Sequence, residues 1–377
     1  MSVSAKPPAN DEEFLAAPHI EAIPLTTPFV GPEQLMREGG HGALLRLGAN
    51  ESAFGPSPRA VAAMTAELPR LCWYGDPESY DLRAALAVKH GCAIENVSVG
   101  SGIDDIMGLA VRAFLAPGAL ALTTRGTYPT FNYHVTGFGG TLATVDYAAD
   151  GRVDVDALIA TARARKPAIV YLANPDNPSG TLLPPADVLR LFEGLPRESL
   201  LFLDEAYADF VDDDELLPNF THARILRART FSKAYGMAGA RIGYALANAR
   251  NVRTFQKIRL HYGVNRNAQI GALASLADES FRMRVVTDVA AGRADYYAIA
   301  RSLGRPYLES RANFVCIDFE DNARATTVMN ELIKRGVFIR KPGAAPLDRF
   351  VRVSVGTPDE RREFATRLRA TLAEIDS

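Results

Sequence analysis

The sequence predicts an α/β protein of two domains, in which a largely parallel sheet covered by helices is followed by a smaller α+β domain. At 377 residues and 47% hydrophobic content, the chain is long for a single core, so two domains are expected. Between residues 58 and 268, short apolar runs alternate with helical patterns, as in parallel sheets that are buried on both faces. Amphipathic helices and alternating strands follow. We therefore expect an N-terminal arm at residues 1–45, a large domain at 46–268 and a small domain at 269–377.

The first elements follow a polar, Pro-rich lead. Gly and Pro residues in L-L-R-L-G-A-N-E-S-A-F-G-P-S-P-R-A, residues 44–60, predict an extended loop. Apolar residues at helical spacing predict helices at 58–68 and 82–91, and N-V-S-V-G at 96–100 predicts a short strand that ends in glycine. The helix that begins with I-D-D-I-M-G is expected to continue until the Pro-Gly pair at 117–118 stops it.

Apolar runs predict the remaining strands of both domains. In the large domain they occupy residues 119–124, 168–173, 199–204 and 223–230, separated by turn or helix signals. In the small domain, alternating runs at 313–319 and 350–356 predict strands. Because ligands of open α/β sheets bind beyond the carboxyl ends of the strands, the residues that follow each run are the ones to inspect for chemistry.

Composition and charge exclude several classes of partner. Charged residues make up 23% of the chain and the formal net charge is -2, so no basic footprint marks a surface for nucleic acid or an anionic membrane. Cys72, Cys92 and Cys316 are widely spaced, and neither C-x-x-C nor H-E-x-x-H occurs, so neither a disulfide framework nor a common zinc site is expected. No apolar stretch approaches the length of a membrane span. We expect a cytoplasmic, unexported protein that binds small molecules.

Three strand ends carry polar residues suited to a ligand. G-S-G-I-D-D follows the strand at 96–100 and opens a helix, which leaves backbone N–H groups for an anion, although the same pattern also describes a simple helix cap. N-P-D-N-P-S-G forms a tight turn that directs Asn174 or Asn177 into the crevice, although turn chemistry alone also accounts for it. D-E-A-Y places Asp204 and Tyr207 at a strand's carboxyl edge. An ATPase is the alternative for that pattern, but G-x-x-x-x-G-K-[ST] is absent from the chain.

The run R-T-F-S-K-A-Y-G-M-A-G-A-R-I-G-Y adds a lysine in an unusual setting. Lys233 lies between an apolar strand and a helix start made of small residues, where desolvation lowers the pKa of an amine and favours Schiff-base chemistry. Thr230, Ser232 and Arg241 add two hydroxyls and a guanidinium suited to a phosphate dianion. Pyridoxal phosphate requires a lysine, a carboxylate for its ring nitrogen, a donor for its 3-oxygen and a phosphate cradle, and the chain offers all four.

With these motifs in place, the chain resembles the fold-type I pyridoxal-phosphate aminotransferases, and among them the histidinol-phosphate aminotransferases. Matching runs extend from residue 44 to 357. They are L-G-A-N-E-S-A-F-G-P-S-P, W-Y-G-D-P, G-S-G-I-D-D, Y-P-T-F-N-Y, N-P-D-N-P-S-G, D-E-A-Y, the lysine run, N-F-V and R-V-S-V-G-T. The resemblance implies a large domain with a mostly parallel seven-stranded sheet, a smaller α+β C-terminal domain and a homodimer with shared active sites.

The resemblance also implies a role for each matching position. Lys233 forms the Schiff base with the cofactor, and Asp204 pairs with its ring nitrogen. Asn177 and Tyr207 hold its 3-oxygen, so that Lys233, Asp204 and Tyr207 form the catalytic group. The phosphate is assigned to the main chain of Gly102 and Ile103 and to the side chains of Thr230, Ser232 and Arg241.

Two aromatic residues and four substrate-binding positions complete the implied site. Phe131 matches the aromatic ring that stacks on the cofactor, and Tyr74 matches a tyrosine that crosses from the neighbouring subunit to the phosphate. Arg352 matches an arginine that clamps the anionic group of the substrate in a two-pronged geometry, with Arg340 as its companion. Asn50 and Phe29 are the other two positions assigned to the substrate.

The chain departs from the family pattern at a few positions. Gly48, Ser52 and Ala53 replace residues of the usual L-N-A-N-E-N-P, and Gly102-Ile103 replaces a more usual Gly-Ser or Gly-Ala. Phe29 follows a proline where a tyrosine often contacts the substrate phosphate, so one phosphate donor is missing. The cofactor chemistry is untouched by these changes.

The predicted function is that of a ping-pong aminotransferase, in which Lys233 is nucleophile and then general acid/base. The resemblance implies histidinol phosphate as donor and 2-oxoglutarate as acceptor, with an aromatic amino acid as the alternative donor. A lyase of the threonine-phosphate decarboxylase type shares these motifs, and a non-catalytic cofactor-binding protein is the third possibility.

Overall fold

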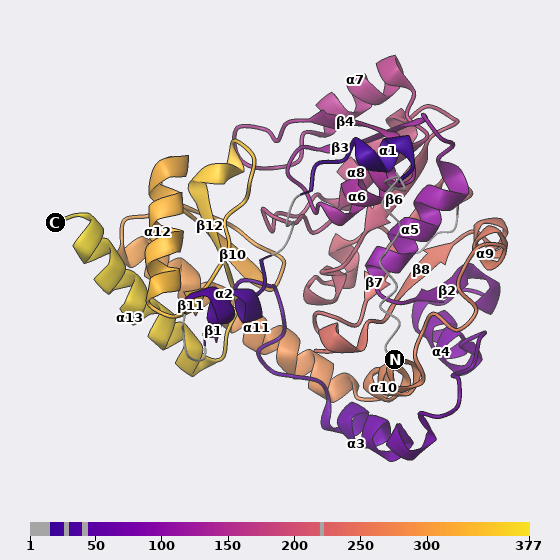
Figure 1. Ribbon diagram of the computed structural model, residues 1–377, viewed down its shortest axis with the longest axis horizontal. Helices are drawn as coiled ribbons and strands as arrows, with labels where there is room; N and C mark the ends of the chain where they lie inside the picture. Colours follow the sequence, from indigo (N-terminus) through magenta and orange to yellow (C-terminus); the bar gives the residue numbers. More distant parts are fainter. Residues whose placement is uncertain (1–15, 26–29, 40–43, 219–221) are drawn as a thin grey trace, which may run out of the picture.

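The computed structural model describes residues 16–25, 30–39, 44–218 and 222–377, and these contain the predicted sheet (Figure 1). Its strands run in the order β2-β8-β7-β6-β5-β3-β4, and every neighbouring pair is parallel except the two that involve β8. The strands are β2 (Val97–Gly100), β3 (Leu120–Thr124), β4 (Thr141–Val145), β5 (Ile169–Ala173), β6 (Leu200–Asp204), β7 (Ile225–Thr230) and β8 (Gly243–Ala247). The prediction of a mostly parallel seven-stranded sheet is confirmed. Strands β4 and β8 lie outside the predicted runs.

Helices cover both faces of this sheet. They are α3 (Pro58–Glu67), α4 (Tyr80–His90), α5 (Ile103–Phe114), α6 (Thr130–Gly137), α7 (Val155–Arg165), α8 (Pro185–Gly194), α9 (Ala249–Gln256) and α10 (Arg266–Leu276). Ile169 and Tyr171 of β5 pack in one core cluster with α5 and α6, whereas Val170 and Leu172 pack in another with α7 and α8. Alternate residues of one strand thus bury opposite faces, as a continuous apolar run requires.

Helix α5 is shorter than the sequence predicts. It ends at Phe114 rather than at the Pro-Gly pair, and Leu115 already has extended backbone angles, φ -111° and ψ 106°. Proline excludes its preceding residue from the helical region, so the chain leaves the helix before Pro117 rather than at it.

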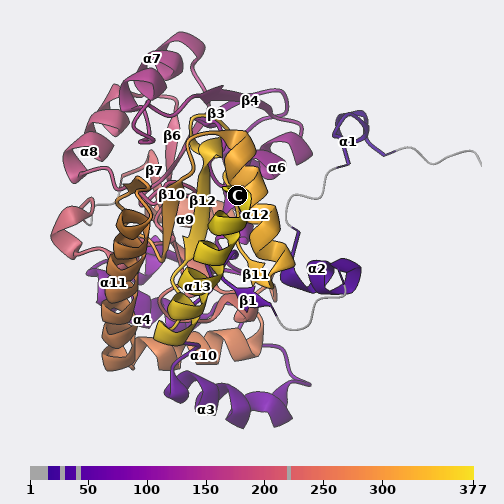
Figure 2. The same cartoon turned by 90° about the vertical axis from the view of Figure 1, so that its left-hand side faces the viewer.

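The small domain is an antiparallel sheet with helices on it. Its strands run in the order β12-β10-β9, and the two predicted runs are β10 (Phe314–Asp318) and β12 (Phe350–Ser354), with β9 (Tyr307–Leu308) beside them. Its helices are α11 (Glu279–Ser302), α12 (Asn322–Lys334) and α13 (Pro358–Ile375). Figure 2 shows α11 and α13 in front of β10 and β12. None of the helices in the described ranges is long and apolar enough to cross a membrane.

A segment that precedes the large domain contributes to the small one. Strand β1 (Leu45–Arg46) pairs in parallel with β11 (Val337–Phe338), and the carbonyl oxygen of Leu47 accepts a hydrogen bond from the Ser354 N–H at 2.8 Å. Leu47 is buried in the core cluster of the small domain. The run expected to be an extended loop therefore starts with a short strand. Helices α1 (Pro18–Glu21) and α2 (Pro32–Gly39) come before it, and α2 lies near β1 and β11 in both views (Figures 1 and 2).

Candidate active site

A cavity of about 700 Å³ lies between the carboxyl ends of the parallel strands and the small domain. Its wall is formed by residues that follow β5, β6 and β7, by the start of α5, and by the segments around residues 50, 340 and 352. Most of the predicted site residues line it: Asn50, Ile103, Asn177, Asp204, Tyr207, Thr230, Ser232, Lys233, Arg241, Arg340 and Arg352. Gly102 lies beside it, whereas Phe131 and Tyr74 lie elsewhere, and Phe29 falls outside the described residues.

Asp204 is a buried carboxylate at the end of β6. Only 4% of it is exposed, and its two oxygens accept hydrogen bonds from the Tyr171 hydroxyl at 2.7 Å and from the Ala206 N–H at 3.0 Å. Burial raises the pKa of Asp204 to about 7, and these hydrogen bonds and the charge of Lys233 oppose the rise. A cationic ring nitrogen in the cavity would supply the missing counter-charge.

Lys233 follows β7 and is held by the main chain of a distant segment. Its Nζ donates a hydrogen bond to the Asn50 carbonyl oxygen at 3.1 Å and lies 5.6 Å from the centroid of the Tyr207 ring. Burial lowers the pKa of Lys233 to about 8, and the nearby charge of Arg352 lowers it further, against the opposing effect of nearby carboxylates. The amine is therefore closer to its neutral, nucleophilic form than a surface lysine is.

Tyr207 receives two amide donors and keeps its own proton available. Its hydroxyl oxygen accepts from Asn50 Nδ2 at 3.0 Å and lies 3.4 Å from Asn177 Nδ2. Burial raises the pKa of Tyr207 to about 12, so the hydroxyl stays protonated near neutral pH. Asn50, at a positive φ of 53°, thus touches both Lys233 and Tyr207.

The start of α5 and the loop after β7 form an anion cradle. Gly102 precedes the helix with φ 88°, and a Cβ on it would meet the Arg241 guanidinium at 2.7 Å. Thr230 Oγ1 and Ser232 Oγ lie 2.9 Å apart. Arg241 pairs with Asp104 at 3.3 Å. Backbone N–H groups at a helix start, two hydroxyls and a guanidinium are the donors that a phosphate dianion prefers.

The structure corrects the position of the aromatic ring. Phe131 is completely buried in the core and stacks on Tyr171 with a centroid distance of 4.8 Å, so its ring does not reach the cavity wall. Tyr128 lines the cavity instead, and its hydroxyl donates to Asp104 Oδ1 at 3.0 Å. Phe131 is the second residue of α6 and packs inward, which the three aromatics of Y-P-T-F-N-Y could not reveal. Tyr128 follows the end of β3, which is the place where a ligand contact is expected.

Arg352 and Arg340 form the opposite wall. Arg352 donates to Asn177 Oδ1 at 2.5 Å and to the Gly48 carbonyl at 3.2 Å, while its Nε is buried with no hydrogen-bond partner in the described chain. Within the same ranges it forms no ion pair with a carboxylate. Arg340 is its backbone partner and donates to the Val30 carbonyl at 2.8 Å. A buried guanidinium with an unused donor is a binding position for an anion.

Tyr74 lies outside the cavity. It is 77% exposed and stacks on Tyr262 with a centroid distance of 4.4 Å. A role in its own subunit's cavity is excluded by this placement, so the predicted role in a neighbouring subunit is the one compatible with it.

Similarity to known proteins extends over most of the chain. The family model described as "Aminotransferase class I and II" matches residues 43–368. The chain is 36% identical over 340 residues to a histidinol-phosphate aminotransferase of Sphingopyxis alaskensis, which covers 88% of this chain and 91% of that protein. It is 33% identical over 369 residues to histidinol-phosphate aminotransferase 2 of Nitrosospira multiformis, covering 95% and 92%.

Solved structures share the fold. The crystal structure of histidinol-phosphate aminotransferase from Sinorhizobium meliloti in complex with pyridoxal-5'-phosphate matches with a TM-score of 0.92 and 40% identity, covering 97% of this chain and 99% of that one. A Thermus thermophilus aspartate aminotransferase matches with a TM-score of 0.81 at 20% identity, which shows the fold alone.

Proposed function

This chain belongs to the class I and II aminotransferase family, and we propose that it moves the amino group of histidinol phosphate to a 2-oxo acid such as 2-oxoglutarate, with pyridoxal phosphate as cofactor. The observation that carries this proposal is the pair of facing walls in one cavity. One wall holds Lys233 and Asp204, and the other holds Arg352, whose Nε has no partner in the described chain. The relatives named above support the choice of donor.

The residues on the first wall fit pyridoxal phosphate. When bound, the cofactor supplies an aldehyde and an electron-withdrawing ring that stabilises negative charge at the substrate's α-carbon. Asp204 would hold the proton of the ring nitrogen, and Tyr207 with Asn177 would hold the 3-oxygen. Tyr128 takes the stacking position first assigned to Phe131. The phosphate would be held by Gly102, Ile103, Thr230, Ser232 and Arg241.

Lys233 would hold the cofactor covalently and would also move protons. Its pKa of about 8 leaves a useful fraction of neutral amine near neutral pH. Lys233 Nζ would take the proton from the α-carbon of the amino donor, and such positioned acid–base catalysis contributes about 10²- to 10⁴-fold. The carbonyl of Asn50, 3.1 Å away, orients Nζ before the reaction.

The Arg352 guanidinium on the second wall would bind anionic oxygens of both substrates. Histidinol phosphate carries a phosphate and 2-oxoglutarate carries carboxylates, so both present at least two anionic oxygens to Arg352. A planar guanidinium binds such a pair of oxygens in a two-pronged geometry. Arg340 and Asn50 lie on the same wall and would contribute further donors.

We also propose that two copies form a dimer with shared sites. Apolar side chains are exposed on the segments around Tyr74 and Tyr262, among them Trp73 at 62% and Leu260 at 72%. Such a concentration of exposed aromatic and aliphatic side chains is typical of a protein interface. Tyr74 would then reach the cofactor phosphate of the partner copy.

Single-turnover spectroscopy tests the proposed donor. The holoenzyme is mixed with one candidate donor at a time, without any 2-oxo acid, and the absorbance of the cofactor is followed. Histidinol phosphate should convert the aldehyde form of the cofactor to its amine form faster than phenylalanine, tyrosine or phosphothreonine does. Faster conversion by an aromatic amino acid would change the donor, and release of carbon dioxide from phosphothreonine without the amine form would indicate a lyase.

A further inference from the structure

Tyr74 and Tyr262 come from two separate loops that have no regular structure of their own. Tyr74 lies between the short helix η1 (Leu68–Arg70) and α4, and Tyr262 lies between α9 and α10. Their rings are stacked at 4.4 Å with an angle of 27° between the planes, although both are more than half exposed. Exposed loops are usually mobile, so something else must hold this pair in place.

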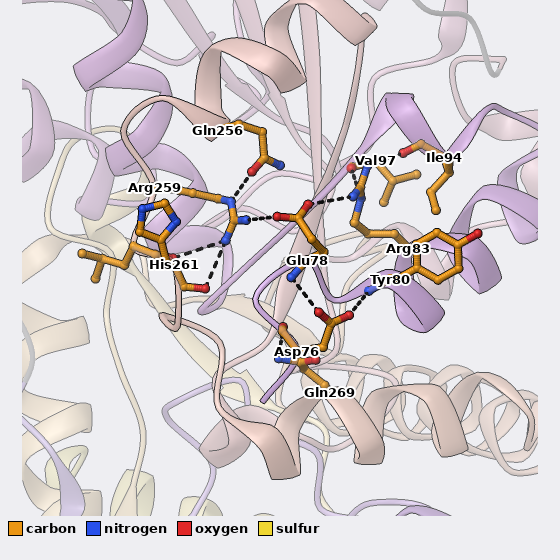
Figure 3. A network of polar contacts seen from close by, with 11 residues as sticks. Asp76, Glu78, Tyr80, Arg83, Ile94, Val97, Gln256, Arg259, His261 and Gln269 are labelled. Atoms are coloured by element: carbon orange, nitrogen blue, oxygen red, sulfur yellow. Dashed lines mark hydrogen bonds and ion pairs between the residues drawn. The ribbon is translucent and has the colours of Figure 1, made fainter. Parts of the chain in front are cut away.

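Glu78 joins the two loops. One of its carboxylate oxygens accepts a hydrogen bond from Arg259 at 2.9 Å, and the other lies 3.5 Å from Arg83 (Figure 3). Arg259 belongs to the loop of Tyr262 and also donates to the His261 carbonyl at 3.2 Å. Arg83 lies on α4 and donates to the carbonyls of Val97 and Ile94 at 2.9 and 3.0 Å. Glu78 therefore connects the tyrosine-bearing loops to the sheet.

A second connection supports the first. Gln269 of α10 donates from one amide nitrogen to the Asp76 carbonyl at 3.0 Å and to the Val264 carbonyl at 3.1 Å. The Asp76 carboxylate accepts from the N–H groups of Glu78 and Tyr80 at 2.9 and 2.7 Å, which fixes the backbone between them (Figure 3). The Glu78–Arg259 pair and the Gln269–Asp76 hydrogen bond together fix the orientation of the two loops relative to each other.

Glu78 forms ion pairs with both Arg259 and Arg83. The side chains of Arg259 and Arg83 are only 11% and 13% exposed, and in the described ranges Glu78 is the only carboxylate that forms an ion pair with either. Loss of its charge would leave two nearly buried guanidiniums close together with no anion between them. Although the Glu78 side chain is 57% exposed, the two guanidiniums are largely buried, so loss of its charge should disfavour this arrangement of the loops.

We propose that Glu78 is a positioning residue for the cofactor phosphate of the neighbouring subunit, acting through Tyr74. The inference rests on the proposed function, in which Tyr74 crosses to the partner copy. A tyrosine hydroxyl binds a phosphate oxygen only when its ring is held at the right place and angle. Glu78 supplies that restraint through its contacts with Arg259 and Arg83, at a distance from the phosphate.

The test compares cofactor affinity in variants of the full-length protein. The dissociation constant of pyridoxal phosphate is measured by equilibrium dialysis, and the mass of the assembly by analytical ultracentrifugation. Glu78→Gln and Tyr74→Phe should each weaken cofactor binding about tenfold, as expected for the loss of one hydrogen bond to an anion. The double variant should be no weaker than Tyr74→Phe alone, because Glu78 acts only through Tyr74.

Controls separate this inference from the proposed function. Glu95→Gln alters a carboxylate near the same arginines that forms no ion pair in the described chain, and it should leave cofactor affinity unchanged. Glu78→Asp keeps the negative charge beside the arginines, so the protein should still fold. Because the aspartate side chain is shorter, cofactor binding should weaken, but by less than in Glu78→Gln. Effects of Glu78→Gln and Tyr74→Phe that multiply, or a Glu78→Gln protein with wild-type affinity, would overturn the inference. Failure of the wild-type protein to bind pyridoxal phosphate would instead reject the proposed function.

Discussion

The two walls of the cavity differ in whether their charged groups already have hydrogen-bond partners. On the large-domain wall, Asp204 already has its hydrogen-bond partners, supplied by Tyr171 and Ala206. On the small-domain wall, Arg352 retains a buried Nε without a partner in the described chain. The difference indicates that one wall is preorganised for a resident group, whereas the other is completed only when an anionic substrate arrives.

A buried ion cluster supports the large-domain wall from behind. Glu205 follows Asp204 directly and pairs with Arg227 at 2.7 Å and with Arg229 at 3.0 Å, and all three side chains are less than 10% exposed. Burial alone would raise the pKa of Glu205, but the two arginines lower it overall. No corresponding carboxylate pairs with Arg352 in the described ranges.

The largest effect is expected from Lys233→Ala. The variant loses the nucleophile and the proton carrier together, so turnover should fall by more than about 10⁴-fold, because acid–base catalysis alone accounts for about 10²- to 10⁴-fold. Steady-state rates with histidinol phosphate and 2-oxoglutarate measure this, with circular dichroism as the check on folding. A biological activity that survives in this variant would favour a non-catalytic role.

Breaking the support behind the first wall should cost stability. Glu205→Gln removes the carboxylate that pairs with both buried arginines, and the free energy of unfolding should fall by about 3 to 5 kcal/mol. Urea unfolding followed by fluorescence measures it. The matched change Glu193→Gln, at an exposed position of helix α8, should alter stability by less than about 0.5 kcal/mol. Equal effects of the two changes would show that the cluster does not support the wall.

Arg352→Met should affect substrates rather than the fold. A neutral side chain removes an unpaired buried charge, so the stability of the cofactor-free protein should stay unchanged or rise. The KM values for both substrates should rise about 10- to 100-fold, the range expected for loss of a charge-assisted hydrogen-bonded contact. Arg352→Lys should recover only part of the loss, because lysine lacks the two-pronged geometry. A large loss of stability would remove the contrast between the walls.

The smallest effect is a shift in pH dependence that couples the two walls. Lys233 captures the cofactor only as the neutral amine, so the capture rate should rise with pH and level off above its pKa of about 8. The charge of Arg352 lowers that pKa, so the midpoint should move to higher pH in Arg352→Met and stay in place in Arg352→Lys. Stopped-flow absorbance of the cofactor-free protein, mixed with pyridoxal phosphate on both sides of this pH, measures the midpoint.

The sequence located the large-domain wall better than the fine structure around it. Asp204 ends strand β6 and Lys233 follows strand β7, and the rule that ligands bind beyond the carboxyl ends places them in one crevice. The same rule applies to Tyr128, whereas three aromatics within six residues do not reveal that Phe131 is the one that packs inward. Strand β8 was missed because its first two residues, Gly243 and Tyr244, belong to the glycine-rich lysine run.

Contacts between distant segments could not be predicted from local patterns. Asn50 touches Lys233, Tyr207 and Ser354, which are separated from it by 157 to 304 positions, and only the folded chain brings them together. Likewise, nothing in the spacing of Glu78 and Arg259 indicates that they pair. The pairing of β1 with β11 is another contact between distant segments that local patterns do not reveal.

The strand pairing of β1 with β11 has a consequence for protein engineering. Leu45–Leu47 pairs with β11 and accepts a hydrogen bond from Ser354 of β12. The small domain therefore consists of two separate segments of the chain. In a chimera that takes only residues 269–377 from a relative, strand β1 of this chain would have to pair with strand β11 of the relative. Chimeras that exchange both Leu45–Leu47 and residues 269–377 should therefore fold and carry the substrate preference of the donor relative. Chimeras that exchange residues 269–377 alone should not give folded protein.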